Sequence, residues 1–115
     1  MISLNPSYTR SSRVTGTSFT GTIKATHAEL TEWFGHSQQT DEYKTDAEWH
    51  VALEKNGEDV GFVAIYNYKN GKNYLGANGL NVDDMDEWHV GSKTKMELWD
   101  LEEGIDLLRV KEGKV

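Results

Sequence analysis

The chain contains no cysteine, which excludes disulfides, thiolate catalysis and cysteine-based zinc sites. It has one proline and 11 glycines in 115 residues, too few for a collagen-like or proline-rich protein. No apolar run approaches the roughly 18 residues of a membrane span, and the N-terminus lacks the apolar segment of a signal peptide. We therefore expect a small, soluble, intracellular protein whose core depends on four tryptophans, five tyrosines and three phenylalanines.

Carboxylates are missing from the first 28 residues, which carry three basic side chains, whereas residues 29–115 carry 19 acids and 9 bases. The formal charge of −7 is therefore the sum of a basic start and a strongly acidic remainder. Serine and threonine supply 11 of the first 26 residues, and such a stretch buries too little apolar surface to offset its ordering entropy. We predict a flexible basic arm over residues 1–16 and a single compact domain over residues 17–115.

Acidic residues are densest late in the chain, where eight carboxylates are accompanied only by Lys93 and Lys95. An acidic surface disfavours duplex nucleic acid, because affinity there comes largely from neutralised phosphates. It favours a basic protein partner, whose encounter the field accelerates. The alternative is a solvated surface that promotes solubility. The predicted partner-binding residues are Asp83, Asp84, Asp86, Glu87, Glu97, Asp100, Glu102 and Glu103.

Alternation of apolar and polar residues predicts strands at residues 17–25, 47–54, 60–68 and 87–91. The third of these is apolar on both faces through its middle, which is typical of a central strand. Asn56-Gly57 between the second and third strands is a strong hairpin signal. A glycine- and asparagine-rich loop is expected from Asn70 to Gly79.

Two capping boxes predict the helices. Thr26 and Glu29 precede an apolar face formed by Leu30, Trp33 and Phe34, and Gly35 is the expected stop. Thr94 and Glu97 start a second helix with apolar residues at helical spacing, and Gly104 is expected to end or bend it. The fold class is therefore α+β: a four-stranded, mainly antiparallel sheet with two helices on one face, in the order β-α-β-β-β-α.

The tetrapeptide Glu-Trp-His-Val occurs twice, at residues 48–51 and 87–90. Strand alternation places Glu and His on one face, so Glu48, His50, Glu87 and His89 converge if the two strands are neighbours. Two histidines with two carboxylates suit zinc or iron, or a general acid–base pair in a hydrolase. The simpler interpretation is that the tryptophans fill the core and Glu–His pairs decorate the outer face.

A second group combines rings with lysines: Tyr66, Tyr68, Lys69, Tyr74 and Lys93. Rings can stack on a base and lysines can contact phosphate, so this group is a candidate nucleotide site. Ordinary packing on a sheet face is the alternative. The sequence contains no phosphate-binding loop, dinucleotide fingerprint, nucleophile elbow or HExxH motif, so we expect a protein that is not an enzyme and needs no cofactor.

Several blocks together resemble a family of small, functionally uncharacterised proteins encoded by tailed bacteriophages. The resemblance spans about residues 17–110, and Ser92 stands where the family pattern has a second glycine. The blocks are Leu30 with Phe34-Gly35, Tyr43-Lys44-Thr45-Asp46-Ala47-Glu48-Trp49, Ile65-Tyr66-Asn67-Tyr68-Lys69, Tyr74-Leu75-Gly76 and Glu87-Trp88-His89-Val90-Gly91.

A phage protein of this type implies an inhibitor of a host nucleic-acid-directed or defence protein, of the anti-CRISPR or DNA-mimic kind, acting in the bacterial cytoplasm. A phage protein that sequesters a nucleotide second messenger is the alternative role. The sequence thus favours protein–protein contact with a basic host surface, without duplex nucleic acid or membrane, and it leaves a homodimer open.

Overall fold

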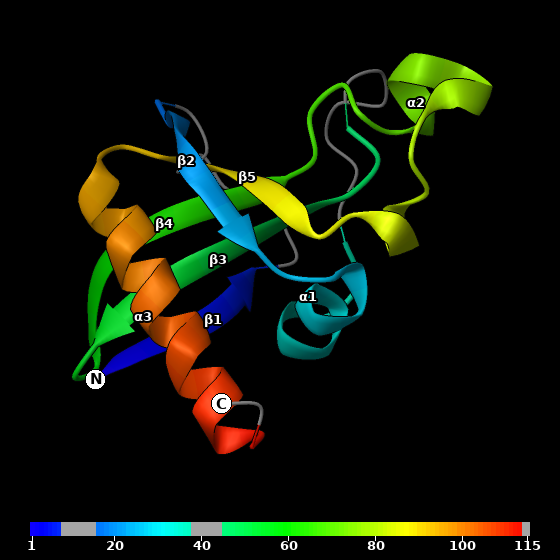
Figure 1. Cartoon of the computed structure of the whole chain (residues 1–115). Coiled ribbons are helices and arrows are strands. Elements are labelled where there is room, and N and C mark those ends of the chain that lie inside the picture. Colours follow the sequence, from blue (N-terminus) through cyan, green and yellow to red (C-terminus); the bar gives the residue numbers. More distant parts are fainter. Residues whose placement is uncertain (8–15, 38–44, 114–115) are drawn as a thin grey trace.

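A computed structural model gives the structure of the chain and describes residues 1–7, 16–37 and 45–113 (Figure 1). Its centre is an antiparallel five-stranded sheet in the order β1-β3-β4-β5-β2. The strands are β1 (Ile2–Ser7), β2 (Ser18–Lys24), β3 (Glu48–Lys55), β4 (Glu58–Tyr66) and β5 (Glu87–Ser92).

Three α-helices accompany the sheet: α1 (His27–Phe34), α2 (Lys72–Leu75) and α3 (Lys95–Lys111). Two single 3₁₀ turns, η2 (Gly76–Asn78) and η3 (Val82–Asp84), follow α2. The α+β class and the antiparallel sheet are confirmed, but the predicted four strands, two helices and β-α-β-β-β-α order are wrong. In the described residues, no helix is long and apolar enough to cross a membrane.

The additional strand is β1, which lies in the segment predicted to be a flexible arm. It pairs with β3 from Ile2 opposite Lys55 to Ser7 opposite His50. Ile2 is buried and Leu4 packs against the core, so alternate side chains of β1 contribute apolar surface. Composition failed here because two apolar residues among serines carry little local signal, whereas the ladder with β3 depends on distant residues. The rest of the predicted arm, residues 8–15, lies outside the described residues.

The turn signals have mixed outcomes. Asn56 and Gly57 both have positive φ (54° and 85°) and connect β3 to β4, as the hairpin signal predicts. The region from Asn70 to Gly79 contains α2 and η2 where a loop was expected. These turns are short and have no buried residue, so no apolar periodicity could reveal them.

Both predicted helix starts are confirmed. Thr26 and Glu29 form a complete capping box, with each side chain bonded to the other's backbone N–H. At α3, the Thr94 hydroxyl accepts from the Met96 amide and donates to the Glu97 carboxylate. The helix does not end at Gly104 but continues to Lys111. The glycine instead allows α3 to pack closely on Leu4 of β1.

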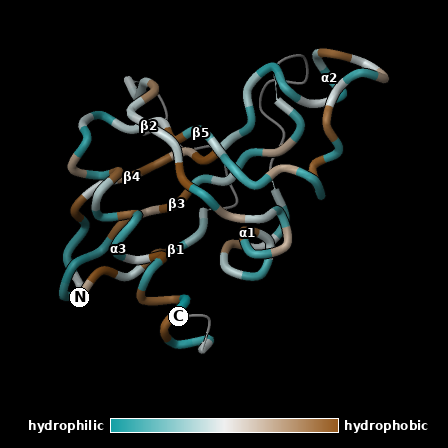
Figure 2. The backbone as a smooth tube through the Cα atoms, viewed as in Figure 1, coloured by the Kyte–Doolittle hydropathy of each residue, from teal (hydrophilic) through white to brown (hydrophobic). Residues whose placement is uncertain are grey.

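One hydrophobic core lies between the sheet and helices α1 and α3. Trp49, Val51 and Leu53 project from β3 on the same face, and α3 adds its buried stripe of Leu98, Leu101 and Ile105. Figure 2 shows hydrophobic residues along the central strands β3 and β4. The rings of Trp49 and Trp88 meet edge to face at 5.2 Å, which joins the sheet centre to β5.

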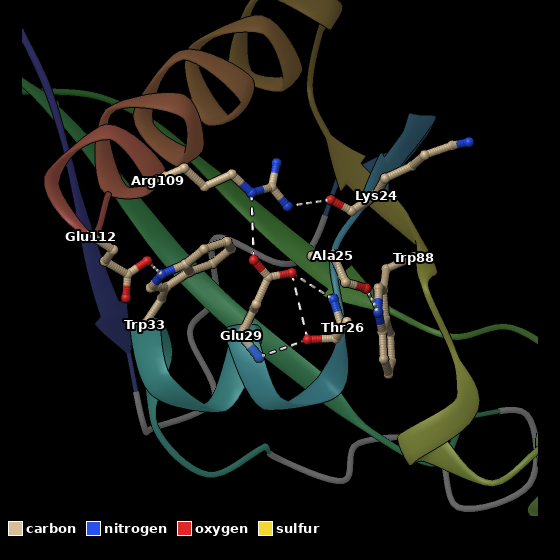
Figure 3. A network of polar contacts seen from close by, with 8 residues as sticks. All are labelled: Lys24, Ala25, Thr26, Glu29, Trp33, Trp88, Arg109 and Glu112. Carbon is tan, nitrogen blue, oxygen red and sulfur yellow. Dashed lines mark hydrogen bonds and ion pairs between the residues drawn. The ribbon is translucent and has the colours of Figure 1, made fainter. Parts of the chain in front are cut away.

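A polar network fastens α3 to α1 and to the end of β2 (Figure 3). Arg109 donates to the Lys24 carbonyl at 2.7 Å, lies 3.5 Å from the Glu29 carboxylate, and stacks over the Trp33 ring at 5.3 Å. The indole N–H groups of Trp33 and Trp88 donate to Glu112 and to the Ala25 carbonyl. The polar groups of this network are paired with one another, so we interpret the network as stabilising the fold and not as a binding site.

Candidate functional site

The eight predicted partner-binding carboxylates precede and follow β5 in the chain. Asp83 and Asp84 belong to η3, and Asp86 and Glu87 are at the start of β5. The remaining four, Glu97, Asp100, Glu102 and Glu103, are in α3. This helix runs back beside β2, because Glu102 lines a pocket with Lys24 and Arg109 donates to the Lys24 carbonyl. The acids therefore form two groups on different elements, one on η3 and the start of β5 and the other on α3.

The first group borders α1. The Asp83 carboxylate lies 3.6 Å from His27 Nδ1 and is largely exposed, so this pair contributes little stability. Asp84, Asp86 and Glu87 help to line a pocket of about 230 Å³ with Asn67 and His89. Three carboxylates around one pocket disfavour an anionic ligand there.

The second group is on α3, where burial of the apolar stripe turns the acids outward. From Met96 to Leu108 the helix carries five acids and no base. Glu102, Glu103 and Asp106 are exposed, whereas Glu97 and Asp100 are half-buried. The outward side of α3 is therefore negative over its central turns.

Two large apolar residues share this outward side. Met96 is 65 % exposed and Trp99 is 59 % exposed, and they are three positions apart, so they lie side by side on the helix. We call Met96, Trp99, Glu102, Glu103 and Asp106 the acidic face of α3. Trp99 is not among the residues predicted from the sequence, although a tryptophan outside the apolar stripe of an amphipathic helix is a recognisable signal.

The aromatic candidates come together in part. The Lys69 ammonium lies over the rings of Tyr68 and Tyr74, at 5.2 and 5.3 Å, and Tyr66 meets Tyr68 edge to face at 6.4 Å. Lys93 is elsewhere, in a pocket with Thr17, Asp59 and Glu97.

His89 and Phe19 extend this aromatic group. His89 contacts the rings of Phe19, Tyr66 and Tyr68, with centroids 4.8 to 6.0 Å apart. Register explains this, because β4 pairs Tyr66 with His89 and β5 pairs Gly91 with Phe19. A nucleotide site in this aromatic group stays a prediction. The pocket that His89 lines is also lined by three carboxylates, which disfavour a phosphate group there.

Tyr66 has the clearest electrostatic perturbation. Its pKa is raised above the ordinary value of 10.0, first because burial disfavours the phenolate, and then because of the Glu48 carboxylate and Tyr68. Glu48 lies directly opposite Tyr66 in the β3–β4 ladder. The phenol is therefore a neutral hydrogen-bonding group at ordinary pH.

The repeated Glu-Trp-His segments do not converge, because β4 lies between β3 and β5. Glu48 instead pairs with His50 of its own strand, with Oε2 2.6 Å from Nε2, and both residues are buried. His89 joins the aromatic group and Glu87 is exposed. Across residues 1–7, 16–37 and 45–113, no three His, Asp, Glu or Cys side chains are arranged to hold a metal ion.

Asn67, buried at 1 % exposure, organises the loops at this end of the sheet. Its carbonyl oxygen accepts from the amides of Asp46 and Ala47, at 2.7 and 3.0 Å. Its amide group donates to the side chains of Asp46 and Asn70. Strand alternation places Asn67 on the core side with Ile65, and that was the signal for a structural asparagine.

Comparison with protein-family models, with curated proteins and with solved structures gives no match for this chain. The resemblance to a phage family therefore stays a prediction. Several residues that carry it have structural roles: Phe34, Trp49, Ile65 and Trp88 are buried in the core. Tyr43 and Lys44 lie outside the described residues.

Proposed function

We propose that the chain is a non-enzymatic binding protein whose acidic face of α3 docks on a basic surface of a partner protein. The observation that carries the proposal is the exposure of Met96 and Trp99 among three exposed carboxylates on one helix. The partner class that fits is a nucleic-acid-directed protein, because such proteins present basic surfaces of the required sign. Occupation of that surface would inhibit the partner.

The two kinds of residue have different tasks. Tryptophan is enriched among the residues that dominate binding energy, because its large surface is desolvated at the centre of an interface. The surrounding carboxylates act mainly on the association rate and on the choice of partner. Since the acids of α3 face outward and carry no compensating base between Met96 and Leu108, their attraction for a basic surface adds up along the helix.

The test begins with affinity capture from nuclease-treated bacterial lysate, using the wild-type chain and three variants. Trp99→Ala removes the apolar anchor, and Glu102→Lys with Glu103→Lys reverses the charge of the acidic face. The control is Asp83→Lys with Asp84→Lys, which makes the same charge change in η3, outside the acidic face of α3. A true partner is retained by the wild type and the control and lost by the first two variants.

The captured protein is then purified for binding kinetics. We expect Trp99→Ala to weaken affinity at least about tenfold, mostly through faster dissociation. Charge reversal should slow association and reduce its salt dependence, and duplex DNA should compete with the wild type. Equal binding of all four proteins, or a partner unaffected by DNA, contradicts the proposal.

A further inference from the structure

The sheet has an open edge at β1. Among the described residues, β1 pairs with β3 on one side, and no strand pairs with its other side. An unpaired edge offers a row of backbone N–H and C=O groups to an incoming strand. The stretch from Ile2 to Pro6 gives room for about five residues of an added peptide.

An apolar groove runs beside this edge. It has a volume of about 460 Å³ and lies between β1 and the second half of α3, with Leu4, Leu107, Leu108 and Val110 among its lining residues. A strand added to β1 would direct alternate side chains to the same sheet face as Ile2 and Leu4, which is the face that α3 covers. The groove is therefore placed to receive those side chains.

The charge of this groove differs from that of the other described pockets. Among the described residues its only charged side chain is Lys111, whereas each of the other three pockets is lined by at least two carboxylates. In a chain of net charge −7, a groove without acids and with one lysine favours an occupant that is apolar and carries a negative end.

We propose that this groove is a peptide-binding site. An extended segment of a partner pairs with the outer edge of β1, places alternate aliphatic side chains between β1 and α3, and turns a terminal carboxylate toward Lys111. Backbone pairing supplies the affinity that is independent of sequence, and the apolar floor selects the side chains. The site is separate from the acidic face of α3.

Pro6 sets the register of such a pairing. Proline has no N–H for a ladder, so it is tolerated where its nitrogen points to the open edge. Residues two positions apart point the same way, so the amides of Ile2 and Leu4 face the open edge as well. The incoming strand thus receives hydrogen bonds from Ile2 and Leu4, and its donors meet the carbonyls of the same edge.

The probe is a fluorescent heptapeptide in which leucine alternates with threonine and the last residue is glutamate with a free carboxylate. We expect saturable binding, by fluorescence anisotropy, with a Kd below about 100 μM. Val110→Glu places a carboxylate at an exposed position of the groove and should weaken binding at least about tenfold. Leu75→Glu, the same type of change at an exposed position outside the groove, should leave the Kd unchanged.

Two further arms test the mode of binding without altering the fold. N-methylation of the peptide amides that face β1 should abolish binding, whereas methylation of the opposite set should not. Lys111→Glu should weaken binding of the peptide that ends in glutamate with a free carboxylate. It should not weaken binding of the matched peptide that ends in glutamine with an amidated C-terminus.

Four results overturn the proposal. The first is the absence of saturation at about 1 mM peptide, and the second is equal binding of the two methylated peptides. The third is displacement of the unmethylated peptide by dodecanoate together with no effect of methylation, and the fourth is a dimer at the assay concentration that Val110→Glu converts to monomer. The third would assign the groove to an aliphatic chain, and the fourth to a second copy of this chain.

Discussion

At Gly104 α3 lies close to Leu4 of β1, and replacing the glycine with alanine tests how tightly the helix packs there. A Cβ atom at residue 104 would lie 2.7 Å from Cγ and Cδ2 of Leu4 and 2.9 Å from Cδ1. These distances are far below carbon–carbon contact, so either Leu4 or the helix must move.

Two opposing effects decide the sign of the change. Alanine in place of glycine within a helix stabilises by about 1 kcal/mol. Overpacking of a closely packed site costs about 1–3 kcal/mol. We therefore expect Gly104→Ala to lower the free energy of unfolding by about 1 kcal/mol, although helix propensity alone predicts the opposite sign.

The background variant Leu4→Ala removes all three crowded carbons, at its own cost of roughly 1–3 kcal/mol for a half-buried leucine. In that background Gly104→Ala should stabilise by about 1 kcal/mol, because only the helix propensity remains. Urea unfolding followed by tryptophan fluorescence measures all four proteins of this cycle. The reasoning is refuted if Gly104→Ala has the same effect in both backgrounds, or if it stabilises the wild type.

Two other predictions concern the end of β4. Because the pKa of Tyr66 is raised above 10.0 in the folded state, its stabilising contribution is complete below pH 10.0 and is lost as pH rises through the folded value. Tyr66→Phe should therefore reduce alkaline destabilisation and remove the late-ionising tyrosine from an absorbance titration; a late tyrosine that persists in the variant contradicts this. Asn67→Ala leaves the buried amide of Ala47 without its acceptor and should cost about 1–3 kcal/mol in urea unfolding. Asn78→Ala, at an exposed position, is the control, and a loss below about 1 kcal/mol in Asn67→Ala would contradict the assigned role.

For the partner-binding surface, the sequence located the acidic residues but not their arrangement in space. The sequence shows that acids concentrate between residues 83 and 103, and the structure divides them between two places, η3 with the start of β5, and α3. Trp99 is as visible in the sequence as any acid. Its exposure follows from the tertiary structure, because Leu98, Leu101 and Ile105 occupy the buried side of α3.

The sequence alone determined the local elements. Thr26 and Thr94 start helices, Asn56-Gly57 makes the hairpin turn, and alternation marks four strands, because each of these signals acts within a few positions of the chain. Tertiary structure decided what depends on distant partners: β1 becomes a strand only against β3, β4 separates the two Glu-Trp-His segments, and the groove is formed by residues of β1 and α3 together. Strand order and close packing are set by contacts between residues far apart in the chain, and no local pattern encodes them.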